Sequence, residues 1–257
     1  MRLRYHQQRP TADLTTNTST TRTTVEQGNI GTTIMSILFI LIIVAGLPLL
    51  SALSYKNIKQ LEAENEGLQF AKTPIYLQSI ALQSILALLA FFAARSEHIQ
   101  VSLHSTFTVL NVASGIAFIG IALLVSYLSD KFGEDKDEGT LHHLLPETIS
   151  DRIWWIIACI VAAFCEEYVY RGVLFGMMME QTGNIWLLAA AISAVVFAFG
   201  HGTQGEKAIL QIIPFAIGFH VIAYLGNGLL LVMIIHFFYN ILVDLFFGAK
   251  IKQKAQR

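Results

Sequence analysis

The chain has 257 residues, of which 54% are hydrophobic and only 14% are charged, and its mean hydropathy is +0.57. This composition excludes an ordinary soluble domain and favours a protein embedded in the lipid bilayer. The net charge of −1 provides no basic field, so no nucleic-acid partner is expected. Both cysteines, Cys159 and Cys165, lie within one apolar run, where we expect packing residues rather than a disulfide or a metal knuckle.

Residues 1–31 contain four arginines and a threonine-rich tract with few apolar residues. This pattern predicts a disordered tail. A secretory signal would have an apolar stretch soon after its first basic residues, and none occurs before about residue 33. We therefore predict that the first apolar run is a retained membrane anchor.

Seven apolar runs follow, and each is a candidate membrane helix because about 20 apolar residues span the hydrocarbon layer. They lie at about 33–54, 74–94, 106–128, 152–178, 185–201, 208–225 and 228–248. The run at 185–201 is short and the run at 208–225 contains Pro214, so either one is expected to be kinked or incompletely spanning. The sequence predicts an all-α, polytopic transmembrane bundle of about seven or eight helices with a membrane-embedded cavity.

Basic residues in the loops predict the orientation. With seven spans, eleven of the 17 Lys and Arg residues lie on the side of the C-terminus, five lie on the other side, and Arg171 lies within a run. By the positive-inside rule this favours a cytoplasmic C-terminus. It also requires the tail with four arginines to cross the membrane, which an eighth span would avoid. We predict a multi-pass protein of the cell membrane.

The run at 152–178 carries three ionisable residues in its middle, Glu166, Glu167 and Arg171. Each costs about 2.5–3.5 kcal/mol at the centre of the bilayer. Glu167 and Arg171 have i,i+4 spacing in the order that favours a helical ion pair. Glu166 points about 100° away around the helix, and without a local partner it is available for chemistry. The alternatives are a purely structural role between helices or a transport pathway.

Two later runs carry histidines. His201 ends the run at 185–201, and His236 and Asn240 lie one turn apart on one face of the last run. Counting about 1.5 Å per residue from the connections places these groups and Glu166 in the same half of the membrane, the half that holds the C-terminus. The four groups are therefore expected to converge.

Such a set suits hydrolysis. A carboxylate and a neutral imidazole within reach of one water can remove its proton and direct it at a peptide carbonyl, while His236 and the Asn240 amide can donate hydrogen bonds to the oxyanion. Glu166, His201 and His236 could instead hold Zn²⁺, although the H-E-x-x-H motif of zincins is absent. We expect no cofactor, with Zn²⁺ as the alternative.

Four short motifs occur in order along this part of the chain: E-E-x-x-x-R at 166–171, F-x-x-x-H at 197–201, F-x-x-G at 215–218 and H-x-x-x-N at 236–240. In this order within membrane helices, they resemble the CPBP family, which includes type II CAAX prenyl endopeptidases and Abi-like bacterial relatives linked to bacteriocin immunity. The resemblance covers about residues 150–245.

The resemblance implies an intramembrane endopeptidase, glutamic-type or metal-dependent, with a site that opens toward the cytoplasm. Composition and the resemblance together divide the chain into a disordered tail at 1–31, membrane helices with an acidic loop at 32–149, a catalytic core at 150–248 and a basic tail at 249–257. The implied roles are water activation by Glu166 and His201, oxyanion stabilisation by His236 and Asn240, and support from Glu167 and Arg171.

The implied substrate is a membrane-associated peptide or protein, with a prenylated CAAX peptide as one option. A non-catalytic immunity or scaffold protein is the alternative function. A transporter with a relay through Glu166, Arg171 and His201 is disfavoured because the first half of the chain has no repeat of the charged helix. His220 departs from the apolar pattern, and we interpret it as a core histidine facing a cavity or as an added proton-handling group.

Overall fold

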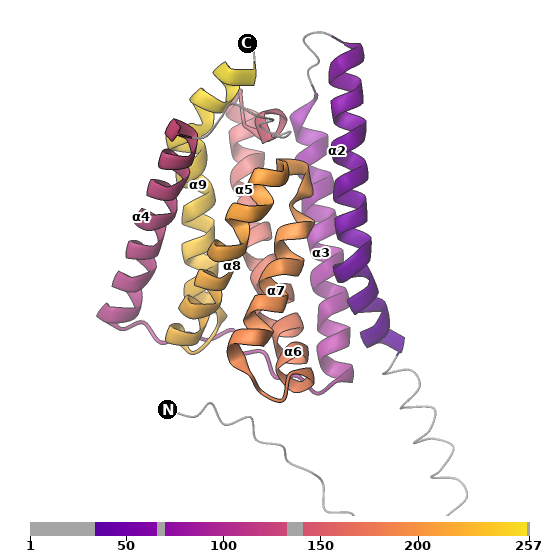
Figure 1. Ribbon diagram of the computed structural model, residues 1–257, viewed down its shortest axis with the longest axis vertical. Helices are drawn as coiled ribbons and strands as arrows, with labels where there is room; N and C mark the ends of the chain where they lie inside the picture. The colour runs from indigo at the N-terminus through magenta and orange to yellow at the C-terminus, as the bar shows by residue number, and fades with distance from the viewer. Residues whose placement is uncertain (1–33, 66–69, 133–140, 256–257) are drawn as a thin grey trace, which may run out of the picture.

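The structure is a computed structural model that describes residues 34–65, 70–132 and 141–255. Within these ranges every regular element is a helix (Figure 1). Six helices are long and apolar enough to cross a membrane, and one further apolar helix is shorter. The predicted all-α polytopic bundle is confirmed. The predicted tail at 1–31 and residues 133–140 of the acidic loop lie outside the described residues.

The N-terminal half contributes three long helices. The first is continuous over Ile34–Glu64 and includes a π-helical turn, η1 (Ile42–Gly46), before α2 (Leu47–Glu64). It is followed by α3 (Lys72–Ser96) and α4 (Val109–Phe132). Helix α2 packs against α7, α3 packs along α5, and α4 packs against α8 and α9. These three helices therefore flank the C-terminal half, with α2 and α3 on one side and α4 on the other (Figure 1).

The central segment begins after the short helix η2 (Leu141–Leu144). It consists of α5 (Ile149–Glu166), the π-helical η3 (Glu167–Leu174) and α6 (Phe175–Gln181), and it runs on as one segment of 33 residues. A capping box starts it, in which the Thr148 side chain accepts from the backbone of Asp151 and the Asp151 side chain accepts from the backbone of Thr148. Asp151 therefore fixes the start of this helical segment.

The remaining helices are α7 (Trp186–Gly200), η4 (Gly202–Gln204), α8 (Glu206–Gly226) and α9 (Leu229–Ala255). Helix α7 was expected to be short, and its 15 residues rise only about 22 Å, less than the hydrocarbon layer of about 30 Å. Helix α8 continues through Pro214 for 21 residues, so only α7 is incomplete. Helix α9 extends beyond its predicted end at residue 248.

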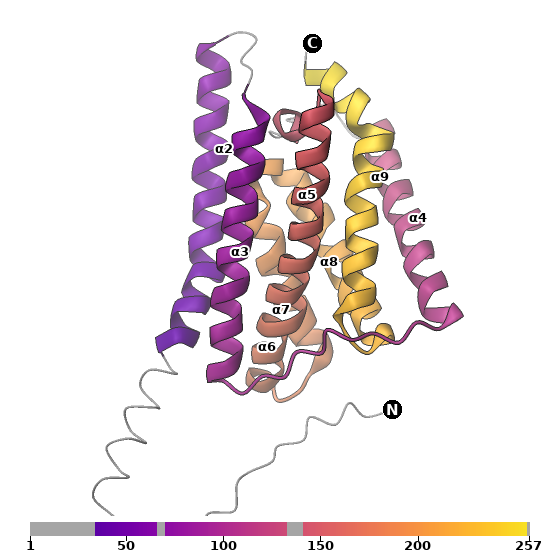
Figure 2. The ribbon, with the colours of Figure 1, turned by 180° about the vertical axis from the view of Figure 1, so that it is seen from behind.

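The short α7 places its connection to α8 below the ends of the neighbouring helices. In Figures 1 and 2, α5 and α9 extend farther toward the end that holds the C-terminus than η4 and the start of α8 do. The backbone N–H of Thr203 donates to the Ser51 hydroxyl of α2 at 2.9 Å, which anchors this recessed turn. His201, at the end of α7, therefore lies below the ends of α5 and α9, and it is partly exposed.

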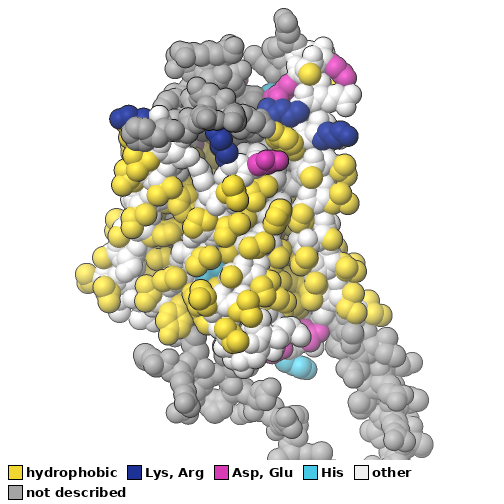
Figure 3. Space-filling view, viewed as in Figure 1, with side chains coloured by type: hydrophobic (Ala, Val, Ile, Leu, Met, Phe, Trp, Pro, Cys, Tyr) yellow, Lys and Arg dark blue, Asp and Glu magenta, His cyan; other side chains and the backbone are white. Residues whose placement is uncertain are grey.

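The outer surface suits a lipid environment. Hydrophobic side chains cover the middle of the molecule, and Lys and Arg gather at the end that holds the C-terminus (Figure 3). Large apolar side chains such as Leu88, Ile121 and Phe238 are at least half exposed there. The molecule is a multi-pass membrane protein, and the cytoplasmic position of its C-terminal end stays a prediction.

Candidate active site

Buried charged groups join the central segment to α9. Glu167, the first residue of η3, has no exposed surface, and Arg171 and His236 are 4% and 5% exposed. Nη1 of Arg171 lies 3.2 Å from Oε1 of Glu167, so the predicted ion pair is present. The same Oε1 lies 2.7 Å from Nδ1 of His236. Glu167 therefore holds both the guanidinium and the imidazole, a link that helical spacing alone did not predict.

The Glu166 carboxylate lies close to side chains from three other helices. Gln83 of α3 donates a hydrogen bond from Nε2 to Oε1 of Glu166 at 2.5 Å. Oε2 lies 3.9 Å from Nε2 of His201 and 3.9 Å from Nε2 of His236. These two distances exceed a direct hydrogen bond and fit groups that share a bridging water. The structure thus brings Glu166, His201 and His236 together.

The hydrogen bonds of the two imidazoles assign their tautomers. Nδ1 of His201 lies 2.9 Å from the Phe197 carbonyl, which can only accept, so Nδ1 carries the proton. Nδ1 of His236 likewise donates to the Glu167 carboxylate. In each neutral ring the other nitrogen, Nε2, therefore has a free lone pair. Both lone pairs lie on the side of Glu166.

Helix η3 alters the geometry assumed for the charged run. The expected α-helix holds up to Glu166 and is replaced by a π-helix over eight residues. Such a turn widens the helix and commonly marks a functional site. Its backbone finds a partner in Ser193 of α7, whose hydroxyl donates to the Tyr170 carbonyl at 2.8 Å. The hydrogen bond from Ser193 therefore anchors the π-helical turn. At its start, Glu166 accepts from Gln83 and Glu167 accepts from His236.

Two phenylalanines enclose the charged groups. The Phe197 ring centre lies 4.2 Å from the Arg171 guanidinium carbon, and the Phe219 ring centre lies 5.3 Å from it. Phe219 also stacks on the His236 ring at 5.0 Å and 27°, and the Phe197 and His201 rings lie 4.4 Å apart. These contacts restrict the rotation of both imidazoles and limit access of water to Arg171.

The F-x-x-G motif acts through packing. A Cβ at Gly218 would lie 2.2 Å from Cε2 of Phe118, so only glycine allows this close approach of α4 to α8. The Phe118 ring then contacts the Phe219 ring at 5.1 Å. Since Phe219 stacks on His236, the motif positions the His236 imidazole indirectly, through Phe118 and Phe219.

Asn240 is half-buried, one helical turn beyond His236 on α9. Within the described part of the chain, no hydrogen bond or ion pair connects it to Glu166, His201 or His236. Its predicted role in binding an oxyanion therefore depends on its helical spacing from His236.

Sequence reasoning missed Gln83 and Phe219. Gln83 is a polar residue in the apolar run at 74–94, but Gln78, Ser79 and Ser84 stand in the same run and give the same signal. Phe219 lies one residue beyond the F-x-x-G motif. Neither contact can be recognised without knowing which helices are neighbours.

The alternative metal set is Glu166, His201 and His236. Its donor atoms suit Zn²⁺, and each Nδ1 hydrogen bond orients an Nε2 lone pair as metal binding requires. A tetrahedral ion with bonds of about 2.1 Å would separate nitrogen and oxygen by about 3.4 Å, whereas the separations are 3.9 Å. Among the described residues, no group of three or more His, Cys, Asp or Glu residues has the spacing of a metal site.

A family model described as Type II CAAX prenyl endopeptidase Rce1-like matches residues 148–242. The matched residues include all four motifs, and they confirm the resemblance expected over about 150–245. The match implies a protease. No curated protein matches the chain. No solved structure matches it either.

Proposed function

We propose that the protein is an intramembrane endopeptidase, in which Glu166 and His201 activate a water that hydrolyses a peptide bond of a membrane-associated substrate. The observation that carries this proposal is the position of Oε2 of Glu166, which lies 3.9 Å from the Nε2 atoms of both His201 and His236. A carboxylate between two imidazole lone pairs is suited to hold one water. The family match over 148–242 supports the class of reaction.

In the first step Glu166 accepts a proton from the water as the water oxygen bonds to the carbonyl carbon. His201 accepts a hydrogen bond from the same water at Nε2 and orients it. In the second step the tetrahedral intermediate collapses, the C–N bond breaks, and the proton held by Glu166 passes to the leaving amine. All atoms are accounted for without a covalent enzyme intermediate.

The hydrogen bond from His236 to Glu167 indicates how the imidazole is positioned beside the oxyanion. Nδ1 of His236 donates to Glu167, and this bond directs Nε2 toward Glu166. Nε2 can donate a hydrogen bond to the oxyanion when the ring carries a second proton. Asn240 provides a further, neutral donor.

The partial exposure of His201 indicates the direction of access. Water and a peptide can approach from the bundle end that holds the C-terminus, because the His201 side chain is 23% exposed and η4 lies below the ends of α5 and α9 at that end (Figure 1). Described basic residues gather at the same end, and they are Lys56, Lys59, Lys72, Lys131, Arg152 and Lys207. By the positive-inside rule we assign this end to the cytoplasmic side of the cell membrane.

The test is cleavage by the purified protein in detergent of a peptide library with prenylated and unprenylated members. We expect Glu166→Gln to lower kcat/KM by about 10²–10⁴-fold, the usual contribution of a general base. Glu180→Gln is the matched control, because Glu180 is exposed on α6 of the same segment, and it should retain activity. Full activity of a folded Glu166→Gln protein would refute the proposal.

The same assay separates the two chemistries. Cleavage that continues after treatment with a zinc chelator supports a water that Glu166 and His201 activate without a metal ion. Cleavage that is lost, and is restored by added Zn²⁺, supports the set of Glu166, His201 and His236 as metal ligands. If folded wild-type protein cleaves no peptide, the immunity or scaffold function becomes the better hypothesis.

A further inference from the structure

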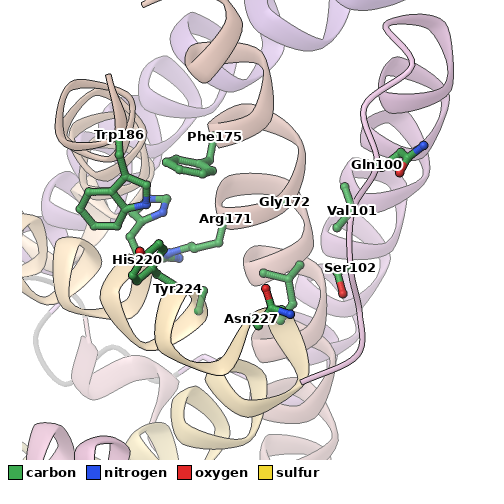
Figure 4. Close-up of a pocket in the computed structure, with 13 residues that line it drawn as sticks. Gln100, Val101, Ser102, Arg171, Gly172, Phe175, Trp186, His220, Tyr224 and Asn227 are labelled. Carbon is green, nitrogen blue, oxygen red and sulfur yellow. The ribbon is translucent and has the colours of Figure 1, made fainter. Parts of the chain in front are cut away.

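A second polar region lies on the other side of Arg171. A cavity of about 350 Å³ is located at the bundle end opposite the C-terminus, where α8 and α9 connect (Figure 4). Its walls come from the segment after α3, from η3 and α6, and from the beginning of α7 and the end of α8. Glu166, His201 and His236 are not among the residues that line it, so the cavity is separate from the candidate active site.

Two buried side chains in the cavity wall have polar atoms without partners. The side chain of Arg171 has no exposed surface, and its Nε has no hydrogen-bond partner among the described residues. His220 is 3% exposed, and its Nε2 also has none. Figure 4 shows the Arg171 side chain extending toward His220. Leaving a buried polar atom unpaired is destabilising, so both side chains call for a ligand.

Three aromatic residues line another part of the wall. Phe175 lies 5.0 Å from the His220 ring and 6.2 Å from the Trp186 ring, and Trp186 lies 5.9 Å from Tyr224. No acidic residue is among those that line the cavity. A negatively charged ligand thus meets a guanidinium, an imidazole and apolar ring faces, with no repelling carboxylate in the wall.

We propose that this cavity binds an anionic group, a carboxylate or a phosphate, carried on a small apolar body. Arg171 and His220 donate charge-assisted hydrogen bonds to the anion, and Phe175, Trp186 and Tyr224 pack against the apolar part. The volume of about 350 Å³ equals that of about a dozen waters at about 30 Å³ each. The cavity therefore takes a short soluble carboxylate or the head-group region of an anionic lipid.

Trp186 in the wall allows a direct binding measurement. The chain has 3 tryptophans, so the variant Trp154→Phe with Trp155→Phe retains Trp186 as its only indole. The probe is a short bromoalkanoate, which quenches nearby indole fluorescence, and the neutral comparison is the bromoalcohol of the same length. We expect saturable quenching by the acid at concentrations at least about tenfold below those needed for the alcohol.

Two substitutions and one control test the location. His220→Phe removes Nε2 while keeping a ring, and it should weaken binding of the acid by about tenfold. Ala223→Phe fills the cavity, because Ala223 is part of its lining, and it should abolish saturable quenching. His104→Phe changes an exposed residue after α3, outside the lining, and should have no effect. If Ala223→Phe does not fold, the quenching measured with His220→Phe tests the proposal by itself.

Vesicles distinguish the two sources of the anion. Brominated phosphatidylcholine with added brominated phosphatidylglycerol should quench more than brominated phosphatidylcholine alone if the anion is a lipid head group. Equal quenching by the two vesicles, with saturable quenching by the bromoalkanoate, identifies a soluble carboxylate. Equal, unsaturable quenching by the bromoacid and the bromoalcohol, or binding unchanged in both His220→Phe and Ala223→Phe, would overturn the proposal.

Discussion

The segment Ile149–Gln181 and helix α3 pack along each other but have different surroundings. In its most apolar window the segment is 39% buried within the protein, whereas α3 is 22% buried. The segment carries Glu166, Glu167 and Arg171, and α3 contributes to the site only the neutral amide of Gln83. The comparison shows that charged groups lie on the segment that other helices shield from lipid, since a charge in lipid costs far more than an amide.

We expect the largest effect from a substitution that removes a shielded charge. Arg171→Leu leaves Glu167 buried without its guanidinium partner, and we expect the free energy of unfolding to fall by about 3–5 kcal/mol. Arg95→Leu is the control, because Arg95 is exposed at the end of α3, and its effect should stay within about 0.5 kcal/mol. Denaturation in mixed micelles measures both. Equal effects would show that shielding does not distinguish these positions.

A smaller effect is expected where α4 approaches α8. Gly218→Ala would bring a Cβ to 2.2 Å from Cε2 of Phe118, and overpacking of this kind costs about 1–3 kcal/mol. Gly120→Ala, on α4 with nothing within 4 Å of its added Cβ, should leave stability unchanged or raise it. Combining Gly218→Ala with Phe118→Leu should recover part of the loss. No recovery would mean that this contact is not the cause.

The amide of α3 gives the next smaller effect. Gln83→Leu removes the hydrogen bond to Oε1 of Glu166, and we expect kcat/KM for peptide cleavage to fall by about tenfold, as for a hydrogen bond to a charged group. Gln78→Leu changes an exposed glutamine of the same helix and should leave the rate unchanged. Equal rates for the two variants would show that Gln83 does not position Glu166.

The smallest effect is expected on the lipid-facing side of α3. Leu88 is 56% exposed, and lipid tails are as apolar as its side chain, so Leu88→Ala should change the unfolding free energy by no more than about 0.5 kcal/mol. Leu86, two residues earlier, is 5% exposed, and Leu86→Ala should cost about 2–5 kcal/mol. Thermal unfolding in detergent compares them. A large loss for Leu88→Ala would indicate a protein partner on this face.

Local patterns in the sequence predicted the features that depend on neighbours along one helix. The lengths of the apolar runs predicted the helices, including the short α7, and i,i+4 spacing predicted the pair of Glu167 and Arg171. His220 was expected to face a cavity or to handle protons, and it lines a cavity.

Contacts between helices could not be predicted in the same way. Glu167 binds His236 across 69 positions of the chain, and Gln83 binds Glu166 across 83. No pattern within one helix specifies which helix packs beside it. The π-helical turn η3 was also missed, since the residues at 167–174 satisfy an α-helical pattern equally well.

Helix η3 makes the number of residues in this stretch as constrained as their identity. A π-helix turns less per residue than an α-helix, so deleting one residue would change both the rotation and the rise between Glu167 and Gly176. The contact of Gly176 with Ile99 would then be altered, and Cγ2 of Ile99 lies only 2.7 Å from where a Cβ of residue 176 would be. The segment should therefore accept many substitutions on its lipid side but no change in length between Glu167 and Gly176.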